Sequence, residues 1–311
     1  MPSAPPPAWH ADAHRLIPRC TFPAAGTPVT CAVSGGADST ALLLLAAIAG
    51  LSVTAIHVDH GLRPGSADEA DIVRATAAAV GASFQAITVH IGEGPNLEAR
   101  ARRARYAALP TDVLTGHTAD DQAETVLLNL MRGAATGGLS AMRPGPRRPL
   151  LALRRADTVA LCAAADVQVV TDPSNAHPRH LRNRVRAELL PLLNELAQRD
   201  VTPVLARQAD VLRDDHDLLE QLAAAIDPTD AKALAAAPTA LARRAVRRWL
   251  TAEHPPDLAA VERVLAVARG DVPATDVGDG VEVRRHRQRL VRRPPAPLPG
   301  TSAFGIDPPT E

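Results

Sequence analysis

The chain of 311 residues has few cysteines, few aromatic residues and a single lysine, and each scarcity disfavours a class of protein. Its three cysteines, Cys20, Cys31 and Cys162, are odd in number, widely spaced and form no Cys-x-x-Cys pair, which disfavours a disulfide framework or a cysteine-bound metal cluster. Aromatic residues make up 2% of the chain, too few for RNA binding through rows of stacked rings. Lys232 is the only lysine, so nearly every cation is arginine.

Long apolar runs are also missing. The longest, Ala41 to Gly50, is too short to span a bilayer, and Met1 to His10 lacks the basic and apolar segments of a secretory signal. We therefore expect a cytoplasmic protein with no membrane partner. The 34 basic and 34 acidic residues give zero net charge, which disfavours a globally basic nucleic-acid binder but is compatible with a local basic face.

The order of hydrophobic segments predicts an α/β fold with a doubly wound parallel sheet, followed by a smaller, mostly helical domain. The expected domains are 1–197, 198–293 and a Pro-rich, disordered tail, 294–311. In such sheets ligands bind beyond the carboxyl ends of the strands. The strands expected in the first domain are 28–33, 51–58, 84–91 and 112–115, and the helices are 39–49, 66–80, 96–109, 119–132 and 181–193. The helices expected in the second domain are 202–225, 240–253 and 258–269, followed by a β-like segment, 281–291.

A Gly-Gly loop lies between the first expected strand and the first expected helix. The paired glycines allow a tight turn, and the free N–H groups of the helix N-terminus attract an anion. Asp38 would repel a bare phosphate, but it would suit a Mg²⁺ ion that bridges the carboxylate and a pyrophosphate. An ordinary strand-to-helix turn is the alternative for the loop alone. The order of residues resembles the phosphate loop of N-type ATP pyrophosphatases, which gives these ATP-binding candidates: Ser34, Gly35, Gly36, Ala37, Asp38 and Ser39.

Three further polar strings follow strands or begin helices. The string 57–63 (HVDHGLR) ends the second strand and places His57 near the expected adenosine position, although a solvated loop would look the same. The string 98–106 is helical, and an exposed, salt-bridged helix explains Arg102 as well as a binding role does. In the string 116–125 (GHTADDQAET), Asp121 and Glu124 are three residues apart, so both carboxylates share a helix face and can bind an ammonium group and accept its proton. A helix cap explains Asp120.

Together these motifs resemble those of the tRNA(Ile)-lysidine synthetase family, over about residues 28 to 193. The resemblance continues through Leu130–Gly133, Gly138–Met142, Arg148–Leu151, Asp172–Asn175 and Arg182–Arg186. It implies a Rossmann-like PP-loop ATPase domain, with ATP and Mg²⁺ as cofactors and Asp38 as the metal ligand. The implied partners are L-lysine and the isoleucine tRNA with a CAU anticodon; the resemblance implies no stable protein partner but leaves a homodimer open.

The implied reaction has two steps. ATP activates the C2 oxygen of the wobble cytidine as an adenylate, with release of pyrophosphate; the ε-amine of lysine then attacks C2 and AMP leaves. The implied catalytic residues are Asp38, Asp121, Glu124 and Arg102, with Asp121 as the base. The implied substrate contacts are Asp121, Glu124, Arg182, Asn183 and Arg186.

Other functions remain open at this point. A PP-loop tRNA thiolase of the 2-thiocytidine type shares the ATP loop but typically carries paired cysteines, which this chain lacks. An amide-forming synthetase of the GMP or NAD kind would not explain the Arg182-Asn183 string, and a nucleotide sensor would not need Asp121 with Glu124. In the second domain four arginines that share one expected helix are candidates for tRNA backbone contact, or part of a solvated face: Arg243, Arg244, Arg247 and Arg248.

Overall fold

The computed structural model describes residues 7–59, 66–89, 92, 97–170, 180–251 and 255–293, with the backbone alone at 66–67, 97–99 and 101–102. The chain divides into two compact units, Met1–Arg213 and Asp214–Glu311, and the division falls inside helix α10 (Thr202–Ala224). The domain limits expected from the sequence, 1–197 and 198–293, stay a prediction. The expected tail, 294–311, lies outside the described residues.

The first unit is built on a parallel sheet. Strands β1 (Pro28–Ala32), β2 (Ser52–Asp59) and β3 (Ser83–Thr88) pair in the order β1-β2-β3. Alternate residues of β2 enter two different cores: Ala55 packs with the helix that follows β1, whereas Ile56 packs on the opposite side of the sheet. Both faces of the sheet are therefore covered at β2, whereas four of the six residues of the edge strand β3 are exposed.

The fourth expected strand, 112–115, is wrong as a strand of that length. Within it, the structure records one parallel bridge, in which Leu114 pairs with Cys31 of β1. The Leu114 N–H donates to the Thr30 carbonyl at 2.8 Å, but the neighbouring N–H groups turn elsewhere: Val113 bonds to Pro110, and Thr115 to the carbonyl of Arg147. The segment nevertheless lies beside β1, on the side away from β2.

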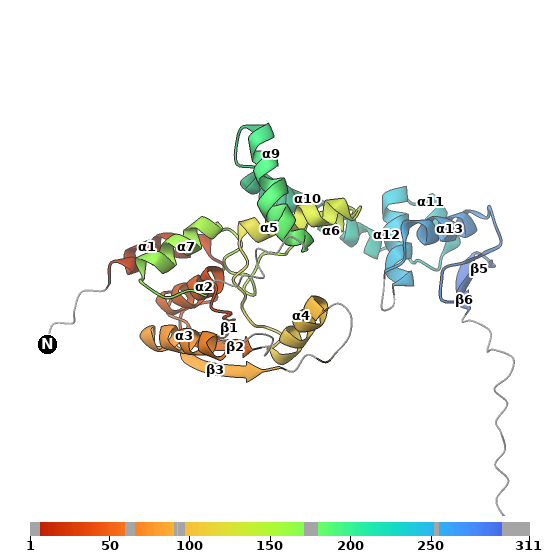
Figure 1. Ribbon diagram of the computed structural model, residues 1–311. Coiled ribbons are helices and arrows are strands. Elements are labelled where there is room, and N and C mark those ends of the chain that lie inside the picture. The colour runs from red at the N-terminus through yellow and green to blue at the C-terminus, as the bar shows by residue number, and fades with distance from the viewer. Residues whose placement is uncertain are drawn as a thin grey trace, which may run out of the picture. The chain divides into compact units, whose positions relative to one another are not determined.

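The direction of the chain reverses at β1. Helices α2 (Ala37–Ile48) and α3 (Ser66–Ala79) connect β1 to β2 and β2 to β3, and α4 (Leu97–Ala108) then leads back to Leu114 on the other side of β1 (Figure 1). The carboxyl ends of β1 and of the segment at Leu114 thus lie at the topological switch point, where open α/β sheets bind their ligands. Both the loop 34–39 and the string 116–125 begin there.

The core on one face of the sheet is dominated by α2. Its residues Leu42 to Leu45 are at most 1% exposed. Two helices that the sequence analysis did not anticipate, α1 (Trp9–Leu16) and α7 (Arg155–Ala164), pack against α2. A short 3₁₀ turn, Ile17–Arg19, follows α1. The first turn of α7 reaches the loop 34–39, where Arg155 and Thr158 contact Asp38.

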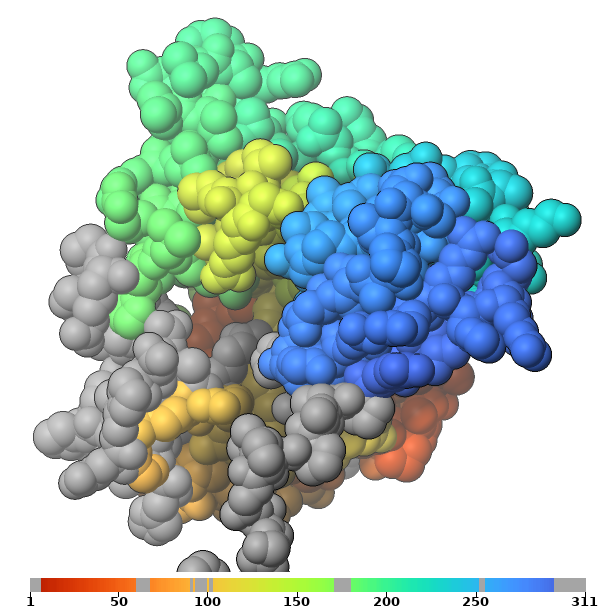
Figure 2. Space-filling view, turned by 90° about the vertical axis from the view of Figure 1, so that its right-hand side faces the viewer, coloured from red at the N-terminus to blue at the C-terminus, as the bar shows by residue number. Residues whose placement is uncertain are grey.

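Where the structure describes it, the rest of the first unit is mainly helical. Helix α5 (Ala119–Met131) is followed by the short α6 (Thr136–Leu139) inside the expected loop. The expected helix 181–193 is confirmed within one uninterrupted helical run, which is made of α8 (Leu181–Arg184), a π-helical turn (Val185–Leu189) and α9 (Leu190–Ala197). Apolar residues of α5 pack against this segment, and Figure 2 shows the yellow surface of α5 and α6 bordering the green surface of residues 180–200.

The second unit combines helices with a small antiparallel sheet of order β4-β5-β6. Its core contains Ala245 and Val246 of α12 with Val264 of α13, which the amphipathic patterns of both helices place inside. Among the described residues, no helix is long and apolar enough to cross a membrane. The elements are α11 (Ala231–Ala236), α12 (Thr239–Leu250), α13 (Leu258–Arg269), β4 (Ala274–Asp276), β5 (Glu282–His286) and β6 (Arg289–Arg293).

Candidate functional site

The loop 34–39 is a tight turn that presents the N-terminus of α2. Gly36 is the N-cap residue, and α2 begins at Ala37. The Ser34 N–H donates to Ser39 Oγ at 3.1 Å, and Ser39 Oγ donates to the Gly36 carbonyl at 2.9 Å. The serine hydroxyls therefore brace the loop from within, while the first N–H groups of α2 are left for an anion.

Two glycines let this loop pack closely against its neighbours. Gly35 has a φ of +86°, and a Cβ there would lie 2.6 Å from Val170 Cγ2. A Cβ on Gly116 would lie 2.5 Å from the carbonyl oxygen of Asp38. Both positions exclude a side chain. Gly116 thereby brings the string 116–125 against the backbone of the phosphate loop.

The Asp38 side chain, in the first turn of α2, contacts α7. Its carboxylate accepts a short hydrogen bond from Thr158 Oγ1 and another from Arg155 Nε at 3.2 Å. Burial raises the pKa of Asp38 above its ordinary value, although the bond from Thr158 and the charge of Arg155 oppose this. The first turn of α7 thus holds this carboxylate.

Asp121 and Glu124 share one face of α5, as their spacing predicts, but both carboxylates are already engaged. Asp121 closes the capping box of α5: its Oδ2 accepts from the Thr118 N–H at 2.9 Å and from Thr118 Oγ1 at 3.2 Å. The cap residue is Thr118, so the expectation that Asp120 caps the helix is wrong. Asp120 instead accepts bonds from Arg154 and from the Arg155 N–H, at 3.0 and 2.8 Å.

Glu124 is completely buried and is surrounded by guanidinium groups. Arg155 Nη1 reaches its Oε1 at 3.2 Å, and Arg182 Nε reaches Oε2 at 2.6 Å. Arg186 binds both oxygens, with Nε at 2.7 Å and Nη2 at 3.2 Å. The π-helical turn follows Arg184, so α8 and this turn present Arg182 and Arg186 to the same carboxylate.

Asp121 completes this group. Its Oδ1 accepts from Arg155 Nη2 at 3.0 Å and from Arg182 Nη2 at 3.1 Å. Burial acts to raise the pKa of Asp121, but the charges of Arg155 and Arg182, together with the hydrogen bond from the Thr118 N–H and the charge of His117, hold the pKa below its ordinary value. We call the following six residues the carboxylate–arginine cluster: Asp38, Asp121, Glu124, Arg155, Arg182 and Arg186.

The remaining residues expected at the site lie around this cluster or outside the described parts. His57 is buried and donates from Nδ1 to the Val33 carbonyl at 3.0 Å, so it braces the end of β1. Asn183 is half-buried beside Arg182 in α8. Arg102 lies in α4, but its side chain is outside the described residues, as are the loop 60–65 and the segment 171–179.

A magnesium ion fits the donor set at Asp38. In the parts of the chain that the structure describes, no group of three or more His, Cys, Asp or Glu side chains could hold a metal ion. Nucleotide-bound Mg²⁺ needs less, because one or two carboxylates and the substrate phosphates commonly suffice. The Asp38 side chain is 24% exposed at the phosphate loop, which suits that mode of binding.

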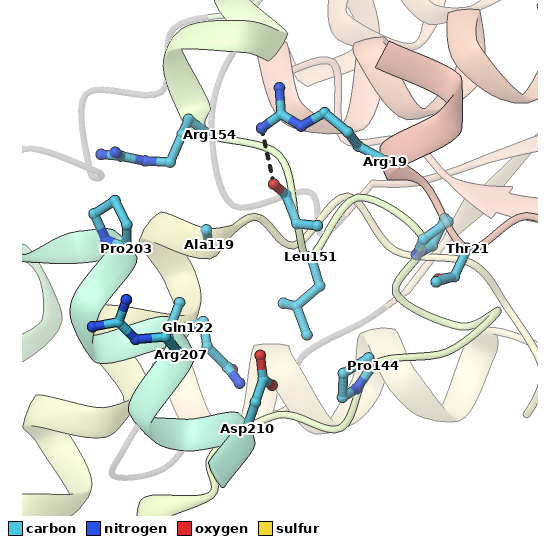
Figure 3. Close-up of a pocket in the computed structure, with 13 residues that line it drawn as sticks. Arg19, Thr21, Ala119, Gln122, Pro144, Leu151, Arg154, Pro203, Arg207 and Asp210 are labelled. Atoms are coloured by element: carbon cyan, nitrogen blue, oxygen red, sulfur yellow. Dashed lines mark hydrogen bonds between the residues drawn. The ribbon is translucent and has the colours of Figure 1, made fainter.

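A separate cavity of about 370 Å³ opens on the other side of α5 (Figure 3). Ala119 and Gln122 line it, together with Leu151, Arg154 and Arg207. The Met142 backbone holds the Gln122 amide in place: Nε2 donates to the Met142 carbonyl and Oε1 accepts from the Met142 N–H, both at 2.9 Å. None of the site residues expected from the sequence lines this cavity, so it is distinct from the cluster.

Sequence reasoning missed Arg155 and Thr158. They stand on the first turn of α7, between Asp38 and α5, and both contact Asp38. The available signal was the Asp at position 157, three residues after Arg154, because an acid at this spacing favours the start of a helix. The chemical role of Arg155 is visible only in three dimensions.

Two family models match different parts of the chain. A PP-loop domain matches residues 13–193, which is more than half of the chain, and a TilS substrate binding domain matches residues 230–291. The first match contains every residue of the carboxylate–arginine cluster. The second covers α12 and α13, but not the cluster.

Two curated relatives that match most of the chain have the same name. The tRNA(Ile)-lysidine synthase of Nocardia farcinica is 42% identical over 89% of this chain and 95% of its own length, and that of Mycolicibacterium paratuberculosis is 47% identical over 71% and 73%. Among solved structures, the U34-tRNA thiolase NcsA from Methanococcus maripaludis covers 66% of this chain and 78% of its own, at 17% identity and a TM-score of 0.49, too weak a likeness to support a conclusion. The chain belongs to the tRNA(Ile)-lysidine synthase family.

Proposed function

We propose how this ATP-dependent ligase, which forms lysidine on tRNA(Ile), divides its reaction among the residues of the cluster. The observation that supports the proposal is the joining of two half-sites at the switch point: the phosphate loop with Asp38, and the α5 face with Asp121 and Glu124. In this scheme the first half-site activates the wobble cytidine with ATP, and the second supplies the amine of lysine.

Adenylation uses the loop 34–39. The N–H groups and positive dipole end of α2 bind the phosphates, and Ser34 and Ser39 supply hydroxyl donors. Mg²⁺ held by Asp38 would neutralise charge on the departing pyrophosphate. The C2 oxygen of the cytidine attacks the α-phosphorus, pyrophosphate leaves, and the poor leaving oxygen becomes part of an adenylate.

The amine step uses Asp121 and Glu124. In the structure guanidinium groups occupy both carboxylates, so the ammonium group of lysine binds by displacing one of them. Asp121 is the point of entry, because its side chain is 11% exposed whereas that of Glu124 is 0% exposed. Asp121 accepts a proton from the bound ammonium group despite its low pKa. The lone pair freed on the lysine nitrogen then attacks C2 of the adenylate, which draws this proton transfer forward. AMP then leaves and lysidine remains.

An arginine displaced from these carboxylates by lysine is free to bind phosphate. Arg182 and Arg186 are 33% and 36% exposed, so their outer faces are open to a phosphate of ATP or tRNA, which guanidinium groups bind well. We propose that both residues contact tRNA or nucleotide phosphate, with Asn183 beside them, and that Arg102 contributes from α4. The proposed substrates are the isoleucine tRNA with a CAU anticodon and L-lysine. A homodimer stays a prediction, which light scattering would test.

One assay tests the function as a whole. The purified chain is incubated with Mg²⁺-ATP, labelled lysine and an isoleucine tRNA carrying a CAU anticodon. We expect label in the tRNA together with AMP and pyrophosphate, and no label in a tRNA whose wobble cytidine is replaced by uridine. In a parallel incubation with a sulfide donor, gain of sulfur by the tRNA without gain of lysine label would support the thiolase alternative. For that reaction the described cysteines offer no pair: Cys31 and Cys162 are buried and free.

A further inference from the structure

Arg155 occupies an unusual position between the two half-sites. Each of its three guanidinium nitrogens donates to a different carboxylate: Nε to Asp38, Nη1 to Glu124 and Nη2 to Asp121, at 3.2, 3.2 and 3.0 Å. Asp38 belongs to the phosphate loop, whereas Asp121 and Glu124 belong to α5. Among the described hydrogen bonds and ion pairs, no other side chain joins these two elements in this way.

The backbone of Arg155 is held by a hydrogen bond as well. Its N–H donates to Asp120 Oδ2 at 2.8 Å, which ties the start of α7 to the start of α5. One turn later, Thr158 donates to the other oxygen of Asp38. The Arg155 side chain is 26% exposed, so its neighbours cover most of it.

The two half-sites must act on the same cytidine in succession, so their separation has to be set. We propose that Arg155 is a positioning residue that fixes the lysine half-site relative to the phosphate loop and thereby couples adenylation to lysine transfer. The planar fork of arginine is suited to this task, because it directs three donors at fixed angles, whereas the ammonium group of lysine is a point charge on a flexible stem. This inference rests on the proposed function and adds a residue to it.

The expected consequence is loss of coupling. In Arg155→Gln, adenylated tRNA would wait for a misplaced lysine and lose AMP to water. We therefore expect more than one AMP released for each lysidine formed, where the unchanged chain gives one. Hydrogen bonds to charged groups are worth enough that loss of this alignment should raise the KM for lysine roughly ten- to a hundredfold, with a smaller effect on the KM for ATP.

The experiment compares AMP release, lysidine formation and both KM values in four full-length proteins: the unchanged chain, Arg155→Gln, Arg155→Lys and Arg19→Gln. Arg155→Lys keeps the positive charge and guards against failure of the Gln variant to fold; we expect it to raise the AMP-to-lysidine ratio as well. Arg19→Gln is the matched control, because Arg19 pairs with Asp157 of α7 at 3.0 Å and touches none of the cluster.

The outcomes are distinguishable. A ratio near one and an unchanged KM for lysine in the folded Arg155 variants would overturn the inference, because a purely structural role would lower both steps together. The same changes in Arg19→Gln would also overturn it, since they would reflect the general stability of α7. If the unchanged chain forms no lysidine at all, the proposed function fails and not this inference alone.

Discussion

Replacing Asp121 by Asn separates the two steps of the reaction. Asn keeps the size of the side chain, and its carbonyl oxygen can still accept the Thr118 N–H that Asp121 accepts at 2.9 Å. The helix cap, worth about 1 kcal/mol, is therefore largely retained. What is lost is the negative charge facing Arg155 and Arg182, and with it the proton acceptor for lysine.

The expected loss of rate and of stability can be bounded by general values for a general base and for charge-assisted hydrogen bonds. Loss of a general base commonly slows a reaction by about a hundredfold or more, or about 2.7 kcal/mol in the barrier. The two charge-assisted bonds are worth about 1.5–3 kcal/mol each in favourable cases. The loss of stability should be smaller than their sum, because Arg155 and Arg182 keep Glu124 as a partner and are 26% and 33% exposed. We expect the variant to fold, with a lowered melting temperature.

The assay follows the two products separately. With ATP labelled in the α-phosphate, the adenylated tRNA should form in Asp121→Asn at a rate close to that of the unchanged chain, while transfer of labelled lysine falls by about a hundredfold or more. Asp200→Asn is the control, because Asp200 is a carboxylate that pairs with Arg154, outside the cluster. It should lose stability without separating the steps.

Two results would refute this reasoning. Lysine transfer at the normal rate in Asp121→Asn would show that Asp121 serves only as the capping residue of α5. Loss of adenylation itself, with the fold intact, would assign Asp121 to the ATP half-site, where a role beside Asp38 in binding the metal would then explain it better.

Four further predictions follow from the described residues. Asp38→Ala should abolish tRNA-dependent formation of AMP and pyrophosphate, and appearance of ADP and phosphate in the unchanged chain would show that the loop 34–39 is misassigned. Asp120 and Asp121 have pKa values below the ordinary value of about 3.9. The stability that these two carboxylates contribute is present above that pH and is lost as the pH falls through their pKa in the folded protein. The melting temperature should therefore drop below about pH 4, and it should drop less steeply in Asp121→Asn. Replacing Cys20, Cys31 and Cys162 together by Ser should leave lysidine formation intact, because no thiol takes part in it, where a thiolase would be inactivated. On α12, Arg243, Arg244 and Arg248 already contact Glu262, Glu220 and the Ala223 carbonyl; Arg247→Gln should therefore reduce the slope of log tRNA affinity against log salt by about 0.7–0.9, and an unchanged slope would place Arg247 on a solvated face.

The sequence predicted the fold where local pattern and burial agree. Strands β1 and β2 are apolar runs bounded by turn residues, and α2 follows a Gly-Gly loop, so their positions were predicted to within two residues. The spacing of Asp121 and Glu124 also predicted their shared face on α5. These features depend on neighbours along the chain, and periodicity records them directly.

What could not be predicted depends on partners distant in sequence. Helix α7 has only ten residues and follows the apolar segment Leu150–Leu153, so no clear helical period marks its start. The segment 112–115 looked like a full strand, but Thr115 bonds to Arg147 instead of extending the sheet. The engagement of Glu124 by three arginines joins α5, α7 and the segment after residue 180, and spacing within one helix carries no trace of it.

The balance of charge in the carboxylate–arginine cluster has a kinetic consequence. Its three guanidinium groups and three carboxylates cancel formally, and opposite charges lie within about 3 Å of one another. The potential of so compact a set falls off much faster with distance than that of a single charge, so the cluster adds little to the long-range steering of an approaching polyanion. Diffusional capture of tRNA must then depend on arginines elsewhere on the surface, while the cluster discriminates between ligands only once they are in contact with it.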